Sequence, residues 1–329
     1  MTRYRILCIR TDRLGETILT LPVVTALQAA QPHAELVLLV HPELAGLLNG
    51  LPGVAEIWPY EPEMPRSWQR RALKLASRLR AGRFDLALVC HPKKELHAAV
   101  WLAGIPRRVG YARKWGWCLT DRVPDRKRLG DRHEVECNLD LVRRLGDPVA
   151  APAWRMPAFD EERLQVQAWL RQQAPVASAG VFIAVHPWSS NPLKQWPADR
   201  YRQLIGRLAA RATVVILGGA EARACVSAIL PAGGGRILDL VGRTSLRQLA
   251  AVLQEAVVLV SNDSGPVHLA AALGTATVAL FGGQDPATGP GRWGPWGPGH
   301  TVISRDSLEM ITVEDVLAAV DARVARAAA

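Results

Sequence analysis

Runs of apolar, often β-branched residues alternate with segments of helical periodicity along the whole chain. In the first half, buried strands are predicted over Tyr4–Arg10, Glu35–Val40 and Phe84–Cys90. Amphipathic helices are predicted over Glu16–Gln31 and Arg66–Ala81. This alternation is typical of a parallel sheet with helices on both of its faces.

The same alternation starts again after a Pro- and Ala-rich stretch, Pro148–Pro157, and a polar helix near Asp160–Gln173. Five further strands are predicted, at Val181–Pro187, Thr213–Gly219, Arg236–Gly242, Ala256–Asn262 and Ala276–Gly282. The helices predicted between them are Asp199–Ala210, Ala220–Ile229, Ser245–Glu255 and Ser264–Leu273. Pro286–His300 is rich in Gly, Pro and Trp and is predicted to be loop. A last helix, Val313–Arg326, could pack on either half.

We therefore predict an α/β protein of two doubly wound, Rossmann-like domains in series, residues 1–155 and 156–329. In such parallel sheets, ligands bind at the carboxyl ends of the strands. The expected site is accordingly a cleft across which the two domains face each other.

Composition narrows the class of protein. Hydrophobic residues make up 49% of the 329 residues, which argues against disorder. The five cysteines are scattered without a C-x-x-C pair, which indicates reduced thiols. The apolar stretch Leu269–Phe281 is too short and too interrupted to span a membrane, and the N-terminus does not resemble a signal peptide. We therefore expect a cytoplasmic protein.

Several familiar sites are missing from the sequence. It contains no Gly-Lys-Ser/Thr, no G-x-G-x-x-G after a strand, and no Asp-x-Asp pair that could hold Mg²⁺ on a sugar diphosphate. The stretch His133–Cys137 resembles a zinc-protease helix but ends in Cys instead of His. We expect neither a metal site nor a cofactor.

Positive charge is concentrated in one part of the chain. The formal net charge is +10, and Arg66–Arg132 alone holds 18 basic and 5 acidic residues. The aromatic residues interleaved there are Trp68, Trp101, Tyr111, Trp115 and Trp117. Such a surplus indicates an anionic partner, whether nucleic acid, an acidic membrane surface or a phosphorylated or carboxylated substrate.

The stretch Val260–Gly274 joins the end of a strand to the start of a helix. Asp263 and Ser264 stand at the helix cap, and Gly265 allows an anion to approach the backbone. His268 lies one turn further on the same face as Ser264. A diphosphate would be stabilised here, although an ordinary capped helix with a half-buried histidine explains the same residues.

Two other strand ends carry polar groups. After the strand that ends near His186, Ser189 and Ser190 can donate hydrogen bonds, and Lys194 supplies a cation for a phosphate or is simply solvated. After the first strand, Glu16 opens a helix. It is a candidate general base, with Asp12 as the nearby alternative, or a carboxylate stabilised by the helix dipole.

On these residues the chain resembles glycosyltransferase family 9, the lipopolysaccharide heptosyltransferase family. The matching segments are Arg10–Pro22, Lys194–Pro197, Asn262–Gly265 with His268 and the following Ala-Ala-Ala-Leu-Gly, Phe281-Gly282, Pro286, and more weakly Ala103–Gly110 and His133–Glu136. The resemblance implies a GT-B architecture. It also implies metal-independent, inverting transfer of heptose from ADP-heptose to the lipid A–Kdo inner core at the cytoplasmic leaflet of the inner membrane.

The resemblance also assigns roles to residues. The catalytic base falls on Glu16, where the family more typically has Gly-Asp; the extra methylene extends the carboxylate by ~1.5 Å, so Asp12 stays an alternative base. Lys194 would hold the diphosphate. The other residues expected at the nucleotide sugar are Ser189, Ser190, Asp263, Ser264, Gly265 and His268, with Glu221 and Thr244 near the adenosine.

A Kdo-bearing, phosphorylated acceptor is anionic and lipid-anchored, which would account for the basic segment. Lys93 and Lys94 are the expected acceptor-binding residues, with Arg113 behind them. Two alternatives stay open. One is a related enzyme that uses another nucleotide sugar or glycan. The other is a nucleic-acid-binding protein, which would leave the strand-end motifs without a role; we therefore expect no nucleic acid partner.

Overall fold

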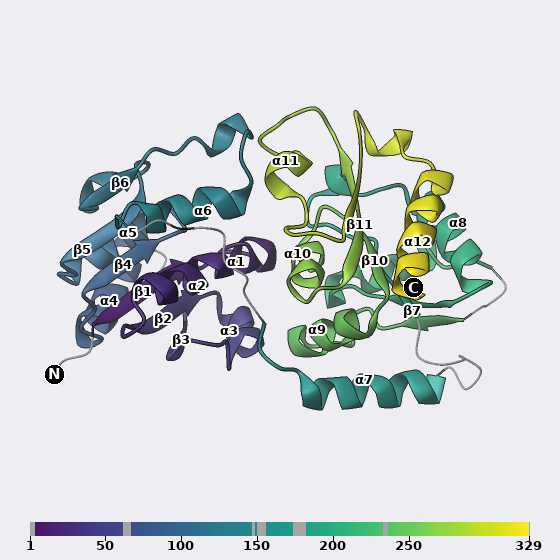
Figure 1. Cartoon of the computed structure of the whole chain (residues 1–329), viewed down its shortest axis with the longest axis horizontal. Coiled ribbons are helices and arrows are strands. Elements are labelled where there is room, and N and C mark those ends of the chain that lie inside the picture. The colour runs from purple at the N-terminus through teal and green to yellow at the C-terminus, as the bar shows by residue number, and fades with distance from the viewer. Residues whose placement is uncertain are drawn as a thin grey trace. The chain divides into compact units, whose positions relative to one another are not determined.

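The chain folds into two compact units, Met1–Pro157 (unit 1) and Ala158–Ala329 (unit 2) (Figure 1). The computed structural model describes residues 4–61, 67–146, 149, 156–173, 182–232 and 236–328. Part of the predicted Pro- and Ala-rich stretch at 148–157 lies outside the described residues.

Unit 1 is built on a six-stranded sheet in the order β3-β2-β1-β4-β5-β6, with parallel pairing throughout its described strands. The strands are β1 (Arg5–Arg10), β2 (Glu35–Val40), β3 (Glu56–Pro59), β4 (Leu86–Val89), β5 (Arg107–Tyr111) and β6 (Asp121–Val123). The helices are α1 (Leu14–Ile18), α2 (Leu21–Ala30), α3 (Pro42–Leu48), α4 (Trp68–Ala81), α5 (Lys94–Leu102) and α6 (Glu134–Arg143), with 3-10 turns η1 (Gly116–Cys118) and η2 (Lys127–Leu129). Because the strand order reverses between β1 and β4, their carboxyl ends form the crevice where such sheets bind ligands.

The single helix predicted over Glu16–Gln31 is two helices, α1 and α2. Pro22 stands in the first turn of α2 and has no N–H to continue a helical ladder from α1. The Thr20 hydroxyl donates to the Glu16 carbonyl (2.8 Å), which satisfies one of the carbonyl groups left free at the break.

Unit 2 repeats the topology. Its sheet has the order β12-β11-β10-β7-β8-β9, again with parallel pairs, so the order reverses between β7 and β10. The strands are β7 (Phe182–His186), β8 (Thr213–Ile216), β9 (Ile237–Asp239), β10 (Val258–Asn262), β11 (Ala276–Gly282) and β12 (Thr301–Arg305). The α-helices are α7 (Asp160–Gln173), α8 (Ala198–Ala209), α9 (Leu246–Glu255), α10 (Gly265–Ala272), α11 (Pro290–Trp293) and α12 (Val313–Ala328), and the 3-10 segments are η4 (Pro192–Lys194), η5 (Ala220–Ala228) and η6 (Leu308–Met310).

Three expectations for unit 2 are refined by the structure. The helix predicted over Ala220–Ile229 is the 3-10 segment η5, and the loop predicted over Pro286–His300 contains the short helix α11. The last helix, α12, packs on α8 and on strands β10, β11 and β12, so it belongs to the core of unit 2.

Apolar side chains fill the space between sheet and helices in each unit. In unit 1, Leu7 and Ile9 of β1 pack with Leu79 of α4. In unit 2, Leu204 of α8 and Val316 of α12 are fully buried in one cluster with the central strands. Because the central strands are apolar on both faces, both sheets must be covered by helices, as the alternating pattern predicted.

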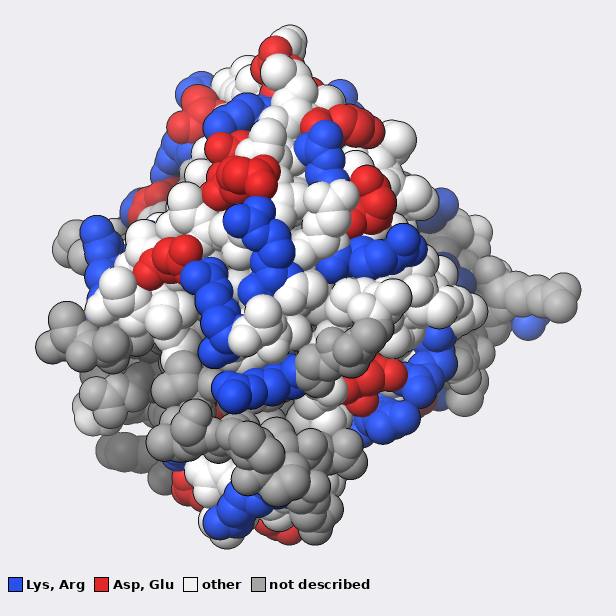
Figure 2. All heavy atoms as spheres, turned by 90° about the vertical axis from the view of Figure 1, so that its right-hand side faces the viewer, with Lys and Arg blue, Asp and Glu red and all other residues white. Residues whose placement is uncertain are grey.

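Charged residues are mixed on the face of unit 2 shown in Figure 2, where Lys and Arg lie close to Asp and Glu. Two ion pairs reach α12 from this part of the unit: Arg207 of α8 pairs with Glu314 (2.7 Å), and Arg211, in the turn just after α8, pairs with Asp321. This mixture agrees with the small net charge of residues 151–329, which hold 16 basic and 14 acidic residues. Within the described part of the chain, no helix combines the length and apolarity needed to cross a membrane.

The start of α9 offers a direct test of the local structure. The Ser245 hydroxyl accepts a hydrogen bond from the backbone N–H of Gln248, and the side-chain oxygen of Gln248 accepts one from the backbone N–H of Ser245. We expect Ser245→Ala to lower the free energy of unfolding by about 1 kcal/mol in urea denaturation, because it removes this capping box. The matched control is Ser227→Ala in η5, another exposed serine, which should leave stability unchanged; equal losses in both variants would contradict the capping assignment.

Candidate active site

The polar residues of unit 2 gather where β7 and β10 end. Ser261 of β10 lies opposite His186 of β7, and its hydroxyl donates to the His186 carbonyl (2.8 Å). The Ser264 hydroxyl lies 2.9 Å from that of Ser261 and 3.4 Å from His186 Nδ1. These contacts fix the chain at the point where the strand order reverses, which is the ligand-binding position of such sheets.

Asn262, the last residue of β10, is fully buried and fixes the neighbouring loop. Its Nδ2 donates to the Pro187 carbonyl (2.6 Å), and its Oδ1 accepts from the Trp196 backbone and the Tyr201 hydroxyl (3.0 Å each). The loop after β7 is thereby held against the end of β10.

Lys194 and Asp263 form an ion pair at this edge. The side chain of Asp263 is 10% exposed, whereas that of Lys194 is 32% exposed. Burial raises the pKa of Asp263, and the Lys194 ammonium opposes that shift. The pair therefore leaves about a third of the Lys194 side chain uncovered at this edge.

Helix α10 begins directly after this pair. The side chain of Ser264, its N-cap residue, makes no capping bond because the hydroxyl is turned toward Ser261 and His186. The positive end of α10, with Gly265 as its first residue, is thus available to an outside anion. His268 is buried one turn further along.

The remaining predicted nucleotide contacts lie on neighbouring loops. Ser189 donates to the Asp263 carbonyl (3.4 Å), and Ser190 is exposed beside it. The carboxylate of Glu221 folds over Gly219, where a Cβ would collide with it. Thr244 follows β9 and directly precedes the cap of α9.

In unit 1, the predicted base and its alternative follow β1. Asp12 accepts a hydrogen bond from Arg10 Nε (2.7 Å), and its other oxygen lies 3.8 Å from His91 Nδ1, just after β4. Glu16 is half-buried in the first turn of α1. Burial, and secondarily the charge of Asp12, raises the pKa of the Glu16 carboxyl. A half-buried carboxylate of raised pKa is suited to accept a proton.

A buried ionic network supports this edge. Glu134 of α6 lies 3.7 Å from Arg10 Nη1 and 2.5 Å from Lys127 Nζ. Lys127 also donates to Asn138, whose Nδ2 donates to the Leu19 carbonyl between α1 and α2 (3.1 and 3.3 Å). The network connects β1, α6 and the α1–α2 corner, so it positions both Asp12 and Glu16.

The predicted acceptor-binding residues follow β4 and β5. Lys93 is the N-cap residue of α5, and Lys94 Nζ lies 4.7 Å from the centroid of the Trp68 ring. Arg113 pairs with Asp125 (2.9 Å). Because β1, β4 and β5 are neighbours, these cations share the carboxyl edge of the unit 1 sheet with Glu16.

Within each unit, the structure therefore brings the predicted residues to one sheet edge. Sequence reasoning missed the residues that support them: Arg10, Glu134 and Lys127 in unit 1, and the roles of His186 and Asn262 in unit 2. Arg10, His186 and Asn262 are polar residues at strand ends, and Arg10 and Glu134 lie in the matching segments Arg10–Pro22 and His133–Glu136, but neither signal identifies the partners of these residues.

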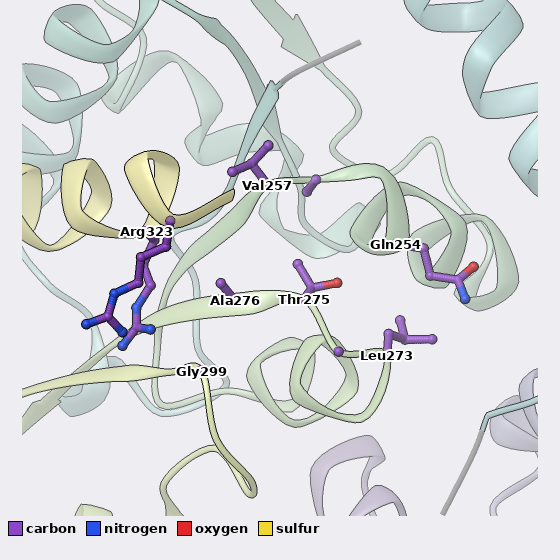
Figure 3. Close-up of a pocket in the computed structure, with 10 residues that line it drawn as sticks. Gln254, Val257, Leu273, Thr275, Ala276, Gly299 and Arg323 are labelled. Carbon is purple, nitrogen blue, oxygen red and sulfur yellow. The ribbon is translucent and has the colours of Figure 1, made fainter. Parts of the chain in front are cut away.

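A separate cavity of ≈ 460 Å³ lies at the opposite edge of the unit 2 sheet (Figure 3). Val257 and Ala276, at the amino ends of β10 and β11, line it together with Arg323. None of the predicted site residues lines this cavity. Among the described residues, no group of three His, Cys, Asp or Glu side chains is arranged to hold a metal ion.

Two doubly wound parallel sheets in series are the architecture of the GT-B class, as the resemblance implied. The family model described as Glycosyltransferase family 9 (heptosyltransferase) matches residues 72–318, and the chain belongs to this family. Among curated proteins, lipopolysaccharide heptosyltransferase 3 of Escherichia coli (strain K12) is 24% identical over 340 residues, covering 93% of this chain and 94% of that protein.

Two solved structures extend the comparison. E. coli ADP-heptose lipopolysaccharide heptosyltransferase II has a TM-score of 0.82 and 25% identity, covering 99% of this chain and 100% of that one. The E. coli heptosyltransferase WaaC with ADP has a TM-score of 0.74 and 20% identity, covering 97% and 99%. The predicted fold class and family are thus confirmed, and the chain is a glycosyltransferase of the lipopolysaccharide heptosyltransferase family.

The half-buried histidine at the end of β7, His186, gives a prediction of how stability depends on pH. Burial lowers the pKa of His186 to about 4, so the folded state keeps this group neutral at a pH where the unfolded chain binds a proton. Stability from this residue is present above pH ~6.5 and is lost as the pH falls toward 4. On acidification from pH 7 to pH 5, the free energy of unfolding of both proteins should fall. We expect the fall to be about 2 kcal/mol smaller in His186→Gln than in the parent.

The comparison requires urea denaturation of both proteins at the two pH values. His33→Gln, which replaces an exposed histidine, is the control and should behave like the parent. If the parent and His186→Gln lost equal stability on acidification, His186 would not be held neutral by burial.

Proposed function

We propose that this chain transfers heptose from ADP-heptose to the lipid A–Kdo inner core of lipopolysaccharide, with inversion at the anomeric carbon and without a metal ion or cofactor. The observation that carries the proposal is the Lys194–Asp263 pair beside the free positive end of α10, at the strand reversal of unit 2. Membership of the heptosyltransferase family and the ADP-heptose named for one related structure support this donor.

The leaving group needs positive charge. As the anomeric C–O bond to the diphosphate breaks, the electron pair stays on ADP, and negative charge grows on the phosphate oxygen. The ammonium of Lys194 and the N–H groups at the start of α10 stabilise that charge. These groups take the place that a metal ion would otherwise fill.

The incoming alcohol needs a base. The acceptor oxygen forms the new bond to the anomeric carbon while its proton passes to the Glu16 carboxylate. Glu16 suits this role better than Asp12, because Asp12 is held by Arg10 (2.7 Å) and faces His91, whereas Glu16 is half-buried and its pKa is raised. Asp12 contributes through its charge, which helps to raise the pKa of Glu16.

The acceptor accounts for the charge of unit 1. Lys93 and Lys94 lie one strand away from Glu16 and would bind the carboxylates and phosphates of an inner-core acceptor, with Arg113 behind them. Since such an acceptor is lipid-anchored, we also propose a cytoplasmic enzyme in peripheral contact with the cytoplasmic face of the inner membrane. The alternative within the family is a transferase for another nucleotide sugar or glycan.

A donor panel tests this proposal. ADP-heptose, ADP-glucose, UDP-glucose and UDP-N-acetylglucosamine are each incubated with the enzyme and a Kdo-lipid A acceptor, with or without EDTA, and product is detected by mass. We expect transfer from ADP-heptose only, at a rate that EDTA does not change. Transfer from a different donor would establish the alternative, and loss of activity with EDTA would disprove metal independence.

Replacing the proposed base should separate chemistry from binding. We expect Glu16→Gln to lower kcat at least 100-fold while ADP affinity, measured by calorimetry, changes less than threefold, because general-base catalysis contributes about 10²–10⁴-fold. The matched control is Glu43→Gln, another glutamate in the first turn of a short unit 1 helix, which should retain full activity.

The pH dependence of kcat distinguishes Glu16 from Asp12. In Asp12→Asn, loss of the neighbouring negative charge should lower the pKa of Glu16 and move the acid limb of the profile to lower pH. Full activity in Glu16→Gln together with inactivity in Asp12→Asn would assign the base to Asp12.

A further inference from the structure

Four tryptophans of unit 1 form a continuous chain of rings, here called the tryptophan cluster: Trp68, Trp101, Trp115 and Trp117. Ring centroids are separated by 4.8 Å between Trp68 and Trp115, 5.3 Å between Trp115 and Trp117, and 5.5 Å between Trp117 and Trp101. Edge-to-face and tilted packing of this kind is favourable and rigid. The cluster is therefore a fixed surface of the folded protein.

The cluster follows the exposed side of α5. Trp68 begins α4, which packs on α5 (Figure 1). Trp101 lies in α5 itself, Trp115 is the N-cap residue of the η1 turn, and Trp117 lies within that turn, which also contacts α5. Within α5 itself, residues 95–100 are buried, whereas Lys94 and Trp101 are exposed. Seven residues apart, these two side chains share one face of the helix, about 10 Å from each other along its axis.

Two rings of the cluster are unusually open to solvent. Trp101 is 46% exposed and Trp117 is 54% exposed. Large aromatic side chains are favoured at such exposure where one end enters an apolar phase and the indole N–H stays in water, as at the interface of a membrane.

Unpaired cations accompany the rings. Lys94 lies over Trp68 (4.7 Å), and Lys114 is an exposed neighbour in sequence of Trp115. Among the described residues, neither of these two cations has an acidic side chain within 4.0 Å. Exposed indoles next to uncompensated cations complement an apolar surface that carries negative headgroups.

The ring spacing disfavours an aromatic ligand between the tryptophans. A nucleobase held between two rings needs centroids about 7 Å apart, twice the stacking distance of ~3.5 Å. The observed separations of 4.8–5.5 Å leave no such gap. The cluster can therefore present its outer edge to a surface, but it cannot enclose a base between neighbouring rings.

We infer that the tryptophan cluster, with Lys94 and Lys114, is the surface by which unit 1 binds an anionic lipid leaflet. The inference deepens the proposed function, because it places the membrane contact on the helix that follows β4, next to the strand that leads to Glu16. A lipid-anchored acceptor would then reach the base while its acyl chains remain in the membrane.

Vesicle co-sedimentation of the full-length protein tests the inference. The parent is compared with Trp101→Ser/Trp117→Ser on vesicles of phosphatidylglycerol and phosphatidylcholine, and on phosphatidylcholine alone. We expect the parent to partition onto the anionic vesicles and the double variant to bind them at least tenfold more weakly. Lys114→Gln should weaken binding about fivefold, and added salt should weaken it further.

The matched control is Leu164→Ser/Met310→Ser, which removes two exposed apolar side chains of unit 2 and should bind like the parent. Thermal unfolding verifies that each variant folds. Equal vesicle binding by the parent and the double tryptophan variant would overturn the inference, as would equal binding to neutral vesicles. Loss of oligonucleotide binding with unchanged vesicle binding in that variant would also overturn it and assign the cluster to nucleic acid.

Transfer assays with two acceptors distinguish a failure of this inference from a failure of the proposed function. With ADP-heptose and a deacylated, water-soluble acceptor, the double tryptophan variant should turn over at the parent rate, whereas its rate on acceptor embedded in vesicles should fall. If the parent transferred heptose to neither acceptor, the proposed function would fail whatever the vesicle result. If the variant kept the parent rate on embedded acceptor, only the membrane assignment would fail.

Discussion

The buried amide of Asn262 is the interaction on which the functional edge of unit 2 depends. This single side chain donates a hydrogen bond to the carbonyl of Pro187 and accepts hydrogen bonds from the backbone of Trp196 and the hydroxyl of Tyr201. Lys194 lies within the loop that these bonds tie down, and Asp263 is the next residue after Asn262. The ion pair and the start of α10 are thus held in register by a side chain that itself contacts no solvent.

Much of the architecture could be predicted from the sequence, because buried parallel strands are apolar on both faces and stand out from amphipathic helices. The strands at Glu35–Val40 and Ala276–Gly282 are as predicted. Elements with weak patterns were missed. Strand β3 has only four residues, none of them buried, and helix α5 is buried over six consecutive positions, which hides its periodicity.

The candidate site was predictable for a different reason. Glu16, Lys194 and Asp263 all follow strand ends, and in a doubly wound sheet such positions converge on one edge. Their roles remain predictions, but their grouping within each unit follows from topology. The network through Arg10, Lys127 and Glu134 could not be anticipated, because it joins Arg10 to Glu134, which lies more than a hundred positions away, and this contact exists only in the folded chain.

The two sheets have the same winding, and the described strands of each pair only within their own unit. Each half therefore carries a complete core and its own set of strand-end loops. Under the proposed function, the residues that select the donor belong to unit 2, and the residues that select the acceptor belong to unit 1. Exchange of one half between relatives, by recombination in evolution or by chimaera construction, can then alter one specificity without dismantling the other.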